Sequence, residues 1–258
     1  MKICVLGSGS SGNCTYVRGG GVVVLVDVGL SGKETLRRLE AIGVPAGEIH
    51  AVCLTHEHDD HCTALRAIGR QAPLGLFANS GTKEAVTRGG KCGDLDWKVF
   101  TTGSSFRIGE LRFDPFSVPH DAYDPVGFVV DDGRVRVGLV TDIGTATGAI
   151  RERLRGCAAI VVEANHDEQM LRDADRPWAL KQRIAGRQGH LSNRQAGELL
   201  AEVAGRDLKT VFLAHLSAEC NRPDLAVKTV AEILVKAGRG DVAVKLTYPD
   251  RPGDVLDL

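Results

Sequence analysis

The stretch Thr55-His56-Glu57-His58-Asp59-Asp60-His61 decides the interpretation of this chain of 258 residues. It directly follows the apolar run Ala51-Val52-Cys53-Leu54, so it stands where a buried strand is expected to end. Imidazole and carboxylate groups suit zinc and other divalent first-row ions. In extended backbone the first two histidines point to the same side and can share one ion, whereas the final aspartate and histidine face a neighbouring position. The motif predicts half of a two-metal site, in preference to a polar loop of hydrogen-bonded histidines.

Apolar and alternating runs predict strands along the whole chain. The predicted strands cover residues 2–6, 22–27, 51–54, 74–78, 110–118, 126–131, 134–141 and 211–213. Asp132-Gly133 is expected to form a two-residue hairpin turn, because glycine accepts the positive φ that such a turn requires. Capping boxes at Ser31 and Ser192 and the proline at 223 mark helix starts. Strands flanked by helices on both sides predict an α/β (α+β) fold, a four-layer αββα sandwich with functional residues at strand ends.

Length and composition predict one domain over residues 1–258, because 43% hydrophobic content is enough for a full core. No stretch approaches the length of a membrane span, and the chain opens on a strand rather than a signal peptide, so no membrane partner and a cytoplasmic location are expected. The seven cysteines are scattered and odd in number, which argues against a disulfide framework.

A net charge of −1 gives no global attraction to nucleic acid, so any attraction to phosphate must be local. One basic tract runs from Arg172 to Arg194 and surrounds Gly189-His190. A solvated face is the usual meaning of such a run. Its position beside a candidate site makes contact with substrate an equally good interpretation.

Six further segments recur with the metal motif: Leu6-Gly7-Ser8-Gly9-Ser10-Ser11-Gly12-Asn13, Val26-Asp27-Val28-Gly29, Thr141-Asp142-Ile143-Gly144, Glu163-Ala164-Asn165-His166-Asp167, Gly189-His190-Leu191-Ser192-Asn193 and His215-Leu216-Ser217. With these segments the chain resembles the metallo-β-lactamase-fold hydrolases. Within them it resembles the YycJ/WalJ-like nuclease branch, which is related to ribonuclease Z-type phosphodiesterases. The resemblance covers nearly the whole chain.

The resemblance implies two divalent metal ions per chain, zinc or manganese. It implies that one ion is held by His56, His58 and His120, and the other by Asp60, His61 and His215. Asp142 would bridge the two ions. Asp27 would brace the metal-binding loop by hydrogen bonds, although an aspartate that only forms a turn is the alternative.

Two bridged ions lower the pKa of a shared water to give hydroxide near neutral pH, and they clamp the attacking and leaving oxygens of an in-line displacement at phosphorus. Phosphodiester hydrolysis is the leading expectation, although the same site can open lactones or thioesters. Glu163 and His190 resemble a ribonuclease Z pair in which the carboxylate orients a histidine that protonates the leaving alkoxide. A structural Glu–His hydrogen bond is the alternative. Asp60, His190 and Glu163 are thus the candidate catalytic residues.

The loop after the first strand offers amides and hydroxyls that can cradle a phosphate. It is not a Walker A loop. A tight connection beneath the predicted metal site is an equally good interpretation. The candidate substrate-binding residues are Ser10, Ser11, Asn13, His190, Ser192 and Asn193. His166 either lines the pocket or caps a helix.

The interval between Asp142 and His215 is too short for the large β-CASP insertion of RNA-processing relatives, and no tRNA-gripping arm is evident. Dedicated mRNA or tRNA processing is therefore disfavoured, and the resemblance implies a 5′ to 3′ exonuclease with DNA as substrate. The alternatives are a hydrolase of small esters, lactones, thioesters or cyclic phosphodiesters, and a regulatory or binding module that retains metals. Aromatic content of 5% shows no stacking platform for single strands, and packing roles are favoured for Trp97, Tyr123 and Trp178.

Overall fold

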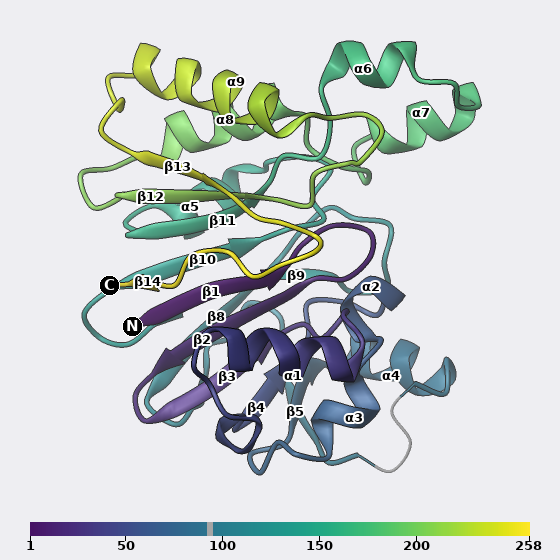
Figure 1. The fold of residues 1–258 in the computed structure, drawn as a ribbon, viewed down its shortest axis with the longest axis vertical. Helices are drawn as coiled ribbons and strands as arrows, with labels where there is room; N and C mark the ends of the chain where they lie inside the picture. Colours follow the sequence, from purple (N-terminus) through teal and green to yellow (C-terminus); the bar gives the residue numbers. More distant parts are fainter. Residues whose placement is uncertain (92–94) are drawn as a thin grey trace.

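The computed structural model describes residues 1–91 and 95–258, and the strands of this part form two sheets that pack face to face (Figure 1). The first sheet has the spatial order β14 (Leu256–Asp257), β1 (Lys2–Gly7), β2 (Cys14–Gly19), β3 (Val22–Val26), β4 (Ala51–Cys53), β5 (Leu76–Asn79) and β6 (Trp97–Phe100). The second has the order β13 (Ala243–Leu246), β12 (Thr210–Ala214), β11 (Ala159–Glu163), β10 (Arg136–Val140), β9 (Val126–Asp131), β8 (Leu111–Ser117) and β7 (Phe106–Ile108).

Helices cover the outer face of each sheet. The first sheet is covered by α1 (Gly32–Ala41), α3 (Leu65–Gly69) and α4 (Ser80–Arg88), and the second by α5 (Gly148–Leu154), α8 (Asn193–Val203) and α9 (Pro223–Lys236). The short helices in the connections are η1 (Ala46–Glu48), α2 (Asp59–Cys62), α6 (Glu168–Asp173) and α7 (Trp178–Ile184). Helices α6 and α7 protrude at one end of the molecule, at the upper right of Figure 1.

Separate hydrophobic clusters fill the spaces between these layers. Phe113 and Phe128 lie in the cluster between the two sheets. Leu39 belongs to the cluster under the helices of the first sheet, and Leu199 to the cluster under those of the second. Each such fully buried side chain contributes about 1.5–3 kcal/mol of transfer free energy. The predicted four-layer αββα sandwich is confirmed.

The predicted helix starts are confirmed, with one difference. Ser192 caps α8 in a complete capping box, and Pro223 is the first residue of α9. Ser31 caps α1 through its Oγ, which accepts from the Glu34 amide. The second contact of the predicted capping box, from the Ser31 amide to the Glu34 side chain, is wrong. The carboxylate of Glu34 binds the guanidinium of Arg38 at 2.6 Å instead.

The hairpin predicted around Asp132-Gly133 is present, but its two-residue turn is wrong. Asp131 pairs with Arg136, which leaves residues 132–135 as the loop. The carboxylate of Asp132 accepts from the amides two and three residues further along the chain, and these bonds stabilise the longer loop.

Among the described residues, no helix is both apolar and long enough to reach across a membrane. Cys92 lies outside the described residues, and the other six cysteines are buried as free thiols. The absence of disulfides among them agrees with the scattered spacing in the sequence.

The strand directions place the candidate residues together. β3 is parallel to β4, and β10, β11 and β12 are parallel to one another. Parallel strands bring their carboxyl ends to the same edge of a sheet, where ligands of α/β folds commonly bind. The two packed sheets therefore present these ends side by side.

Candidate metal centre

Imidazole and carboxylate side chains gather where these strands end. Asp27 follows β3, the histidine motif follows β4, His120 follows β8 and Asp142 follows β10. Glu163 is the last residue of β11, and His215 comes directly after β12. All the sequence-predicted metal ligands lie in this one region.

The first group consists of three ring nitrogens. His56 Nε2 lies 3.1 Å from His58 Nδ1, which lies 3.4 Å from His120 Nε2. Burial, and then the neighbouring His61, hold the pKa of His56 well below its usual value, and burial also lowers the pKa of His120. Neutral rings present lone pairs, so this group is suited to bind a cation.

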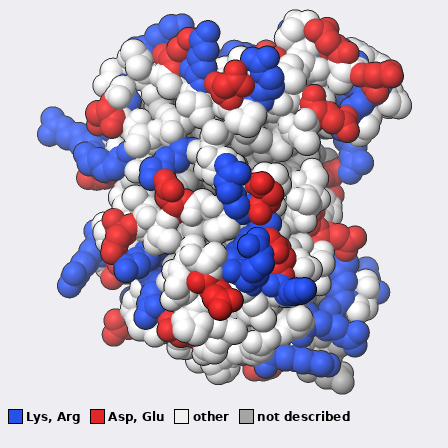
Figure 2. Space-filling model, in the orientation of Figure 1, with Lys and Arg blue, Asp and Glu red and all other residues white. Residues whose placement is uncertain are grey.

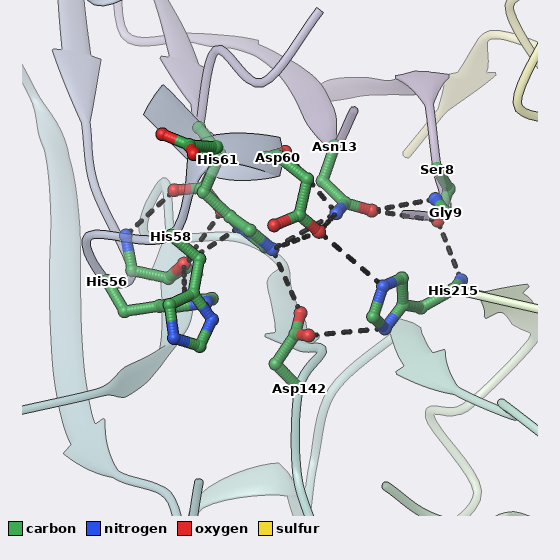
Figure 3. A network of polar contacts seen from close by, with 12 residues as sticks. Ser8, Gly9, Asn13, His56, His58, Asp60, His61, Asp142 and His215 are labelled. Atoms are coloured by element: carbon green, nitrogen blue, oxygen red, sulfur yellow. Dashed lines mark hydrogen bonds and ion pairs between the residues drawn. The ribbon is translucent and has the colours of Figure 1, made fainter. Parts of the chain in front are cut away.

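The second group consists of Asp60, His61 and His215, which point toward one another in Figure 3. His61 Nε2 lies 3.5 Å from Asp60 Oδ2, and His215 Nε2 lies 3.7 Å from the same oxygen. His215 Nε2 is buried and has no hydrogen-bond partner among the described residues. An orphaned buried polar atom costs about 1–3 kcal/mol, so a cation at this position would stabilise it.

Asp142 lies between the two groups. Its Oδ1 is 3.9 Å from His120 Nε2 and 3.2 Å from His215 Nδ1, while its Oδ2 is 3.1 Å from His61 Nε2. Oδ2 is buried without a hydrogen-bond partner among the described residues. The carboxylate therefore faces both groups, and its pKa is held well below its usual range because the nearby histidines, His215 foremost, outweigh the effect of burial.

Asp27 positions the metal motif through hydrogen bonds. The amide and hydroxyl of Thr55 donate to its two oxygens at 2.9 and 2.8 Å, and His61 Nδ1 donates to Oδ2 at 2.8 Å. This bond leaves His61 Nε2 directed at the second group, as expected of an outer hydrogen-bond partner of a ligand. Burial opposes protonation of His61, but Asp27 and Asp142 outweigh it and raise its pKa well above the usual value.

Strained backbone is concentrated at this site. Among the described residues, the non-glycine residues with positive φ are Asp27 at 61°, Asp142 at 54° and His215 at 56°. Such conformations cost of order 1–3 kcal/mol each and persist where the surroundings enforce them, commonly at functional sites. No sequence pattern predicted this feature.

The loop after β1 supports the metal motif. Asn13 Nδ2 donates to Asp60 Oδ2 at 3.0 Å, and Asn13 Oδ1 accepts from the Gly9 amide. Ser8 Oγ accepts from the His215 amide at 2.7 Å. A Cβ at Gly29 would lie 1.5 Å from the Asp60 carbonyl oxygen, so only glycine fits beside the motif. These contacts favour the tight-connection interpretation of the loop.

Ser10 and Ser11 are exposed at the tip of that loop, whereas Asn13 is buried. Ser10 lines a cavity of about 250 Å³ beside His190. The predicted substrate-binding residues Ser192 and Asn193 have partners inside the protein: Ser192 Oγ donates to Glu168 Oε1, and Asn193 Nδ2 donates to Asn221 Oδ1.

Glu163 connects the predicted catalytic pair to the second group. Its Oε1 accepts from His190 Nδ1 and from His215 Nδ1, each at 2.7 Å. Its Oε2 accepts from the amides of Ile143 and Leu191. Although burial opposes ionisation, His190 and then His215 lower the pKa of Glu163 to about 2. The bond to His215 was not predicted.

The side chain of His190 is part-exposed and lines the cavity. Burial opposes its protonation, but Glu163 outweighs burial and raises the pKa of His190 above its usual value. Gly189 has no room for a Cβ, which would lie 2.2 Å from two carbonyl oxygens of the chain around α7. This close approach fixes the backbone that carries His190.

Part of the basic tract reaches this cavity. Arg176 and Arg183 line it together with Asp121, and each guanidinium is paired: Arg176 with Glu219 at 2.6 Å and Arg183 with Asp121. On the face shown in Figure 2, Lys and Arg are interspersed with Asp and Glu. The positive charge of these two cavity residues is therefore offset by a neighbouring carboxylate in each case. Asp121 was missed, although it directly follows His120 in the sequence.

The sequence matches a family model described as beta-lactamase superfamily domain over residues 23–215. The chain is 34% identical to the exodeoxyribonuclease YycJ of Bacillus anthracis over 93% of its own length and 91% of that protein. It is 34% identical to the exodeoxyribonuclease WalJ of Streptococcus pneumoniae over 100% of its length and 98% of that protein. It is 32% identical to the ribonuclease Z of Mycolicibacterium gilvum over 100% of its length and 88% of that protein.

Among solved structures, the metallo-beta-lactamase fold protein YhfI from Bacillus subtilis is similar, with a TM-score of 0.75 and 17% identity. The match covers 99% of this chain and 98% of that one. At this identity the likeness concerns the fold, and it agrees with the two packed sheets described above.

Proposed function

The chain belongs to the beta-lactamase superfamily, and on that premise we propose that it is a dinuclear metal-dependent phosphodiesterase that acts as a DNA exonuclease. The superfamily and the clustered histidines and aspartates support divalent metal ions such as zinc. The named relatives are nucleases, and they support hydrolysis of a nucleic-acid phosphodiester.

The residues present fit two cations. In the proposal His56, His58 and His120 would hold one ion, and Asp60, His61 and His215 would hold the other, with Asp142 facing both groups. Asp142 Oδ2 and His215 Nε2 support this assignment, since both are buried without a hydrogen-bond partner among the described residues. Their ion-pair neighbours, His61 Nε2 at 3.1 Å and Asp60 Oδ2 at 3.7 Å, belong to the same proposed set of ligands. When bound, the two ions supply an acidified water and stabilise the charge of the phosphate.

His190 acts as the proton donor in this proposal. Glu163 accepts from its Nδ1, which leaves Nε2 as the atom that can donate to a leaving alkoxide. The raised pKa keeps the ring protonated at higher pH than an ordinary histidine. The observation that carries the proposal is the shared Glu163 oxygen, because it joins a proposed metal ligand and a proton donor in one unit.

We also propose that residues 1–258 act as one domain. The site draws residues from both sheets, and the two chain ends meet, since the amino group of Met1 donates to the Leu258 carbonyl and the Leu258 amide donates to the Met1 carbonyl. Separating the sheets would divide the site.

The test is hydrolysis of end-labelled single- and double-stranded DNA and RNA by metal-loaded protein, with bis-p-nitrophenyl phosphate alongside. The proposal predicts shortening of DNA from its ends. Cleavage of RNA alone would support phosphodiesterase activity but contradict the proposed preference for DNA. Hydrolysis of small esters, lactones or thioesters, without any phosphodiester cleavage, would contradict both.

A further inference from the structure

Helix α7 has a cavity on each of its two faces. The His190 cavity is lined by Leu180, Arg183 and Ile184. A second cavity of about 270 Å³ is lined by Trp178, Lys181 and Gln182, together with Ala185, which directly follows the helix. The second set has the i, i+3, i+4, i+7 spacing of a single helix face. No residue of α7, which is described in full, is buried. The second cavity therefore lies on the face of α7 that is turned away from the His190 cavity.

The second cavity combines an aromatic wall with cationic and amide groups. Trp178 is 69% exposed, the largest value among the exposed large hydrophobic residues of the described chain. Arg172 from α6 and Lys181 add positive charge, and Lys181 Nζ donates to the Arg172 carbonyl at 2.6 Å, which uses one of its three donor hydrogens. This exposure excludes a core position for Trp178, which was one of the two packing roles, core or rim, favoured from the sequence.

His166 lines the same cavity and is only 2% exposed. Its Nδ1 is buried and has no hydrogen-bond partner among the described residues. Gln195 also lines the cavity, and because its Oε1 accepts from the Ser192 amide, its Nε2 remains as a donor. A cavity lined by such donors suits a polar ligand rather than a purely apolar one.

We propose that this cavity binds one nucleobase of a single-stranded nucleic acid, at a position in the strand away from the scissile phosphate. The base stacks on Trp178, its edge meets the amide groups of Gln182 and Gln195, and Lys181 and Arg172 contact the adjoining phosphate. A nucleobase fits because it alone among the parts of the proposed substrate offers a π-face together with donors and acceptors at its edge. The inference rests on the proposed nuclease function.

The two tryptophans of the chain, Trp97 and Trp178, permit a direct test. In Trp97→Phe, all tryptophan fluorescence comes from Trp178. The metal-loaded protein is titrated with a single-stranded thymidine octamer whose phosphorothioate linkages resist hydrolysis, and with a phosphorothioate octamer of the same length made of abasic units. Saturable quenching by the octamer with bases, and much weaker quenching by the abasic one, is the expected result.

Anisotropy of a labelled octamer gives the affinity separately. Trp178→Ala should weaken binding about 5- to 150-fold, which corresponds to the loss of one stacked base, and Trp178→Phe should restore most of it. Val235→Ala, at another exposed apolar residue on α9, is the matched control and should bind normally.

Equal quenching by both octamers, or unchanged affinity in Trp178→Ala, would overturn the base-stacking site. Hydrolysis of bis-p-nitrophenyl phosphate by the metal-loaded wild-type protein is measured beside these assays. If that hydrolysis occurs while the stacking assays fail, the cavity proposal alone is rejected. If the wild-type protein neither binds an octamer nor cleaves any phosphodiester, the proposed function is rejected with it.

Discussion

His190 and His215 donate to the same oxygen of Glu163, each from its Nδ1 atom at 2.7 Å. His215 is a proposed metal ligand, whereas His190 lines the adjoining cavity. A change in the position or charge of Glu163 therefore acts on metal binding and on proton donation together.

His190→Ala should retain the bound metal but lose activity on the order of 10²–10⁴-fold on a substrate with an alkoxide leaving group. A substrate that releases nitrophenolate should be affected far less, because nitrophenolate departs without a proton. The ratio of the two rates, with metal content by mass spectrometry, checks the assignment. Equal losses on both substrates would exclude the leaving-group role.

The pH profile gives an independent check on the same residue. The pKa of His190 is raised above 6.5. The protonated donor is therefore present at pH values below the raised pKa and is lost as pH rises through it. Activity on the alkoxide substrate should fall on the alkaline side. In His190→Ala this alkaline decrease should be absent, and its persistence would assign it to another group.

Glu163→Gln should weaken both functions of the shared oxygen. The amide can still accept a hydrogen bond, but it cannot support the positive charge of His190, and it holds the proposed ligand His215 less strongly. Loss of an outer hydrogen-bond partner typically lowers metal affinity about 10–100-fold. Titration of the metal-free variant measures this. Unchanged metal affinity would show that the bond to His215 does not support metal binding.

Arg183→Ala should weaken binding of DNA and reduce the slope of log affinity against log salt by about 1, as expected for one lost phosphate contact. Arg183 lines the cavity beside His190 and is paired with Asp121. The matched control is Arg88→Ala, since Arg88 is equally exposed and ion-paired but lies on α4. Identical slopes in both variants would indicate that the basic tract is a solvated face and does not contact the substrate.

Gly29→Ala should destabilise the protein by about 1–3 kcal/mol and lower its metal content, because the new methyl group would overlap the Asp60 carbonyl. Gly47 has open space around the position of its Cβ, so Gly47→Ala is the control. Chemical denaturation and metal analysis of both variants check the prediction. A Gly29→Ala protein with normal stability would mean that the motif can shift without cost.

The sequence predicted the four layers because buried parallel strands read as continuous apolar runs, as in β3 and β12. No strand was predicted at the edge strands β6, β7 and β13, which are short and only partly buried. None was predicted at the interior strands β2 and β11 either, although β11 is a buried apolar run. The four-residue loop at 132–135 was missed because it depends on side-chain hydrogen bonds to the backbone, which a dipeptide does not reveal.

The convergence of the metal motif with His120, Asp142 and His215 could be predicted, since strand ends and a family resemblance place them together. The supporting contacts could not. The positive φ of Asp27 and the bond from Asn13 to Asp60 depend on how distant segments pack, and the second bond to Glu163 depends on the register of β11 with β12. These are tertiary contacts that no local pattern encodes.

The most direct test of the dinuclear centre is the metal stoichiometry of the purified protein, measured by titration and mass spectrometry for the wild type, His58→Ala and Asp142→Ala. The assignment predicts about two divalent ions per wild-type chain, fewer ions in both variants, and loss of phosphodiesterase activity with the fold retained. A wild-type protein that holds no transition metal and remains fully active in chelator would contradict it.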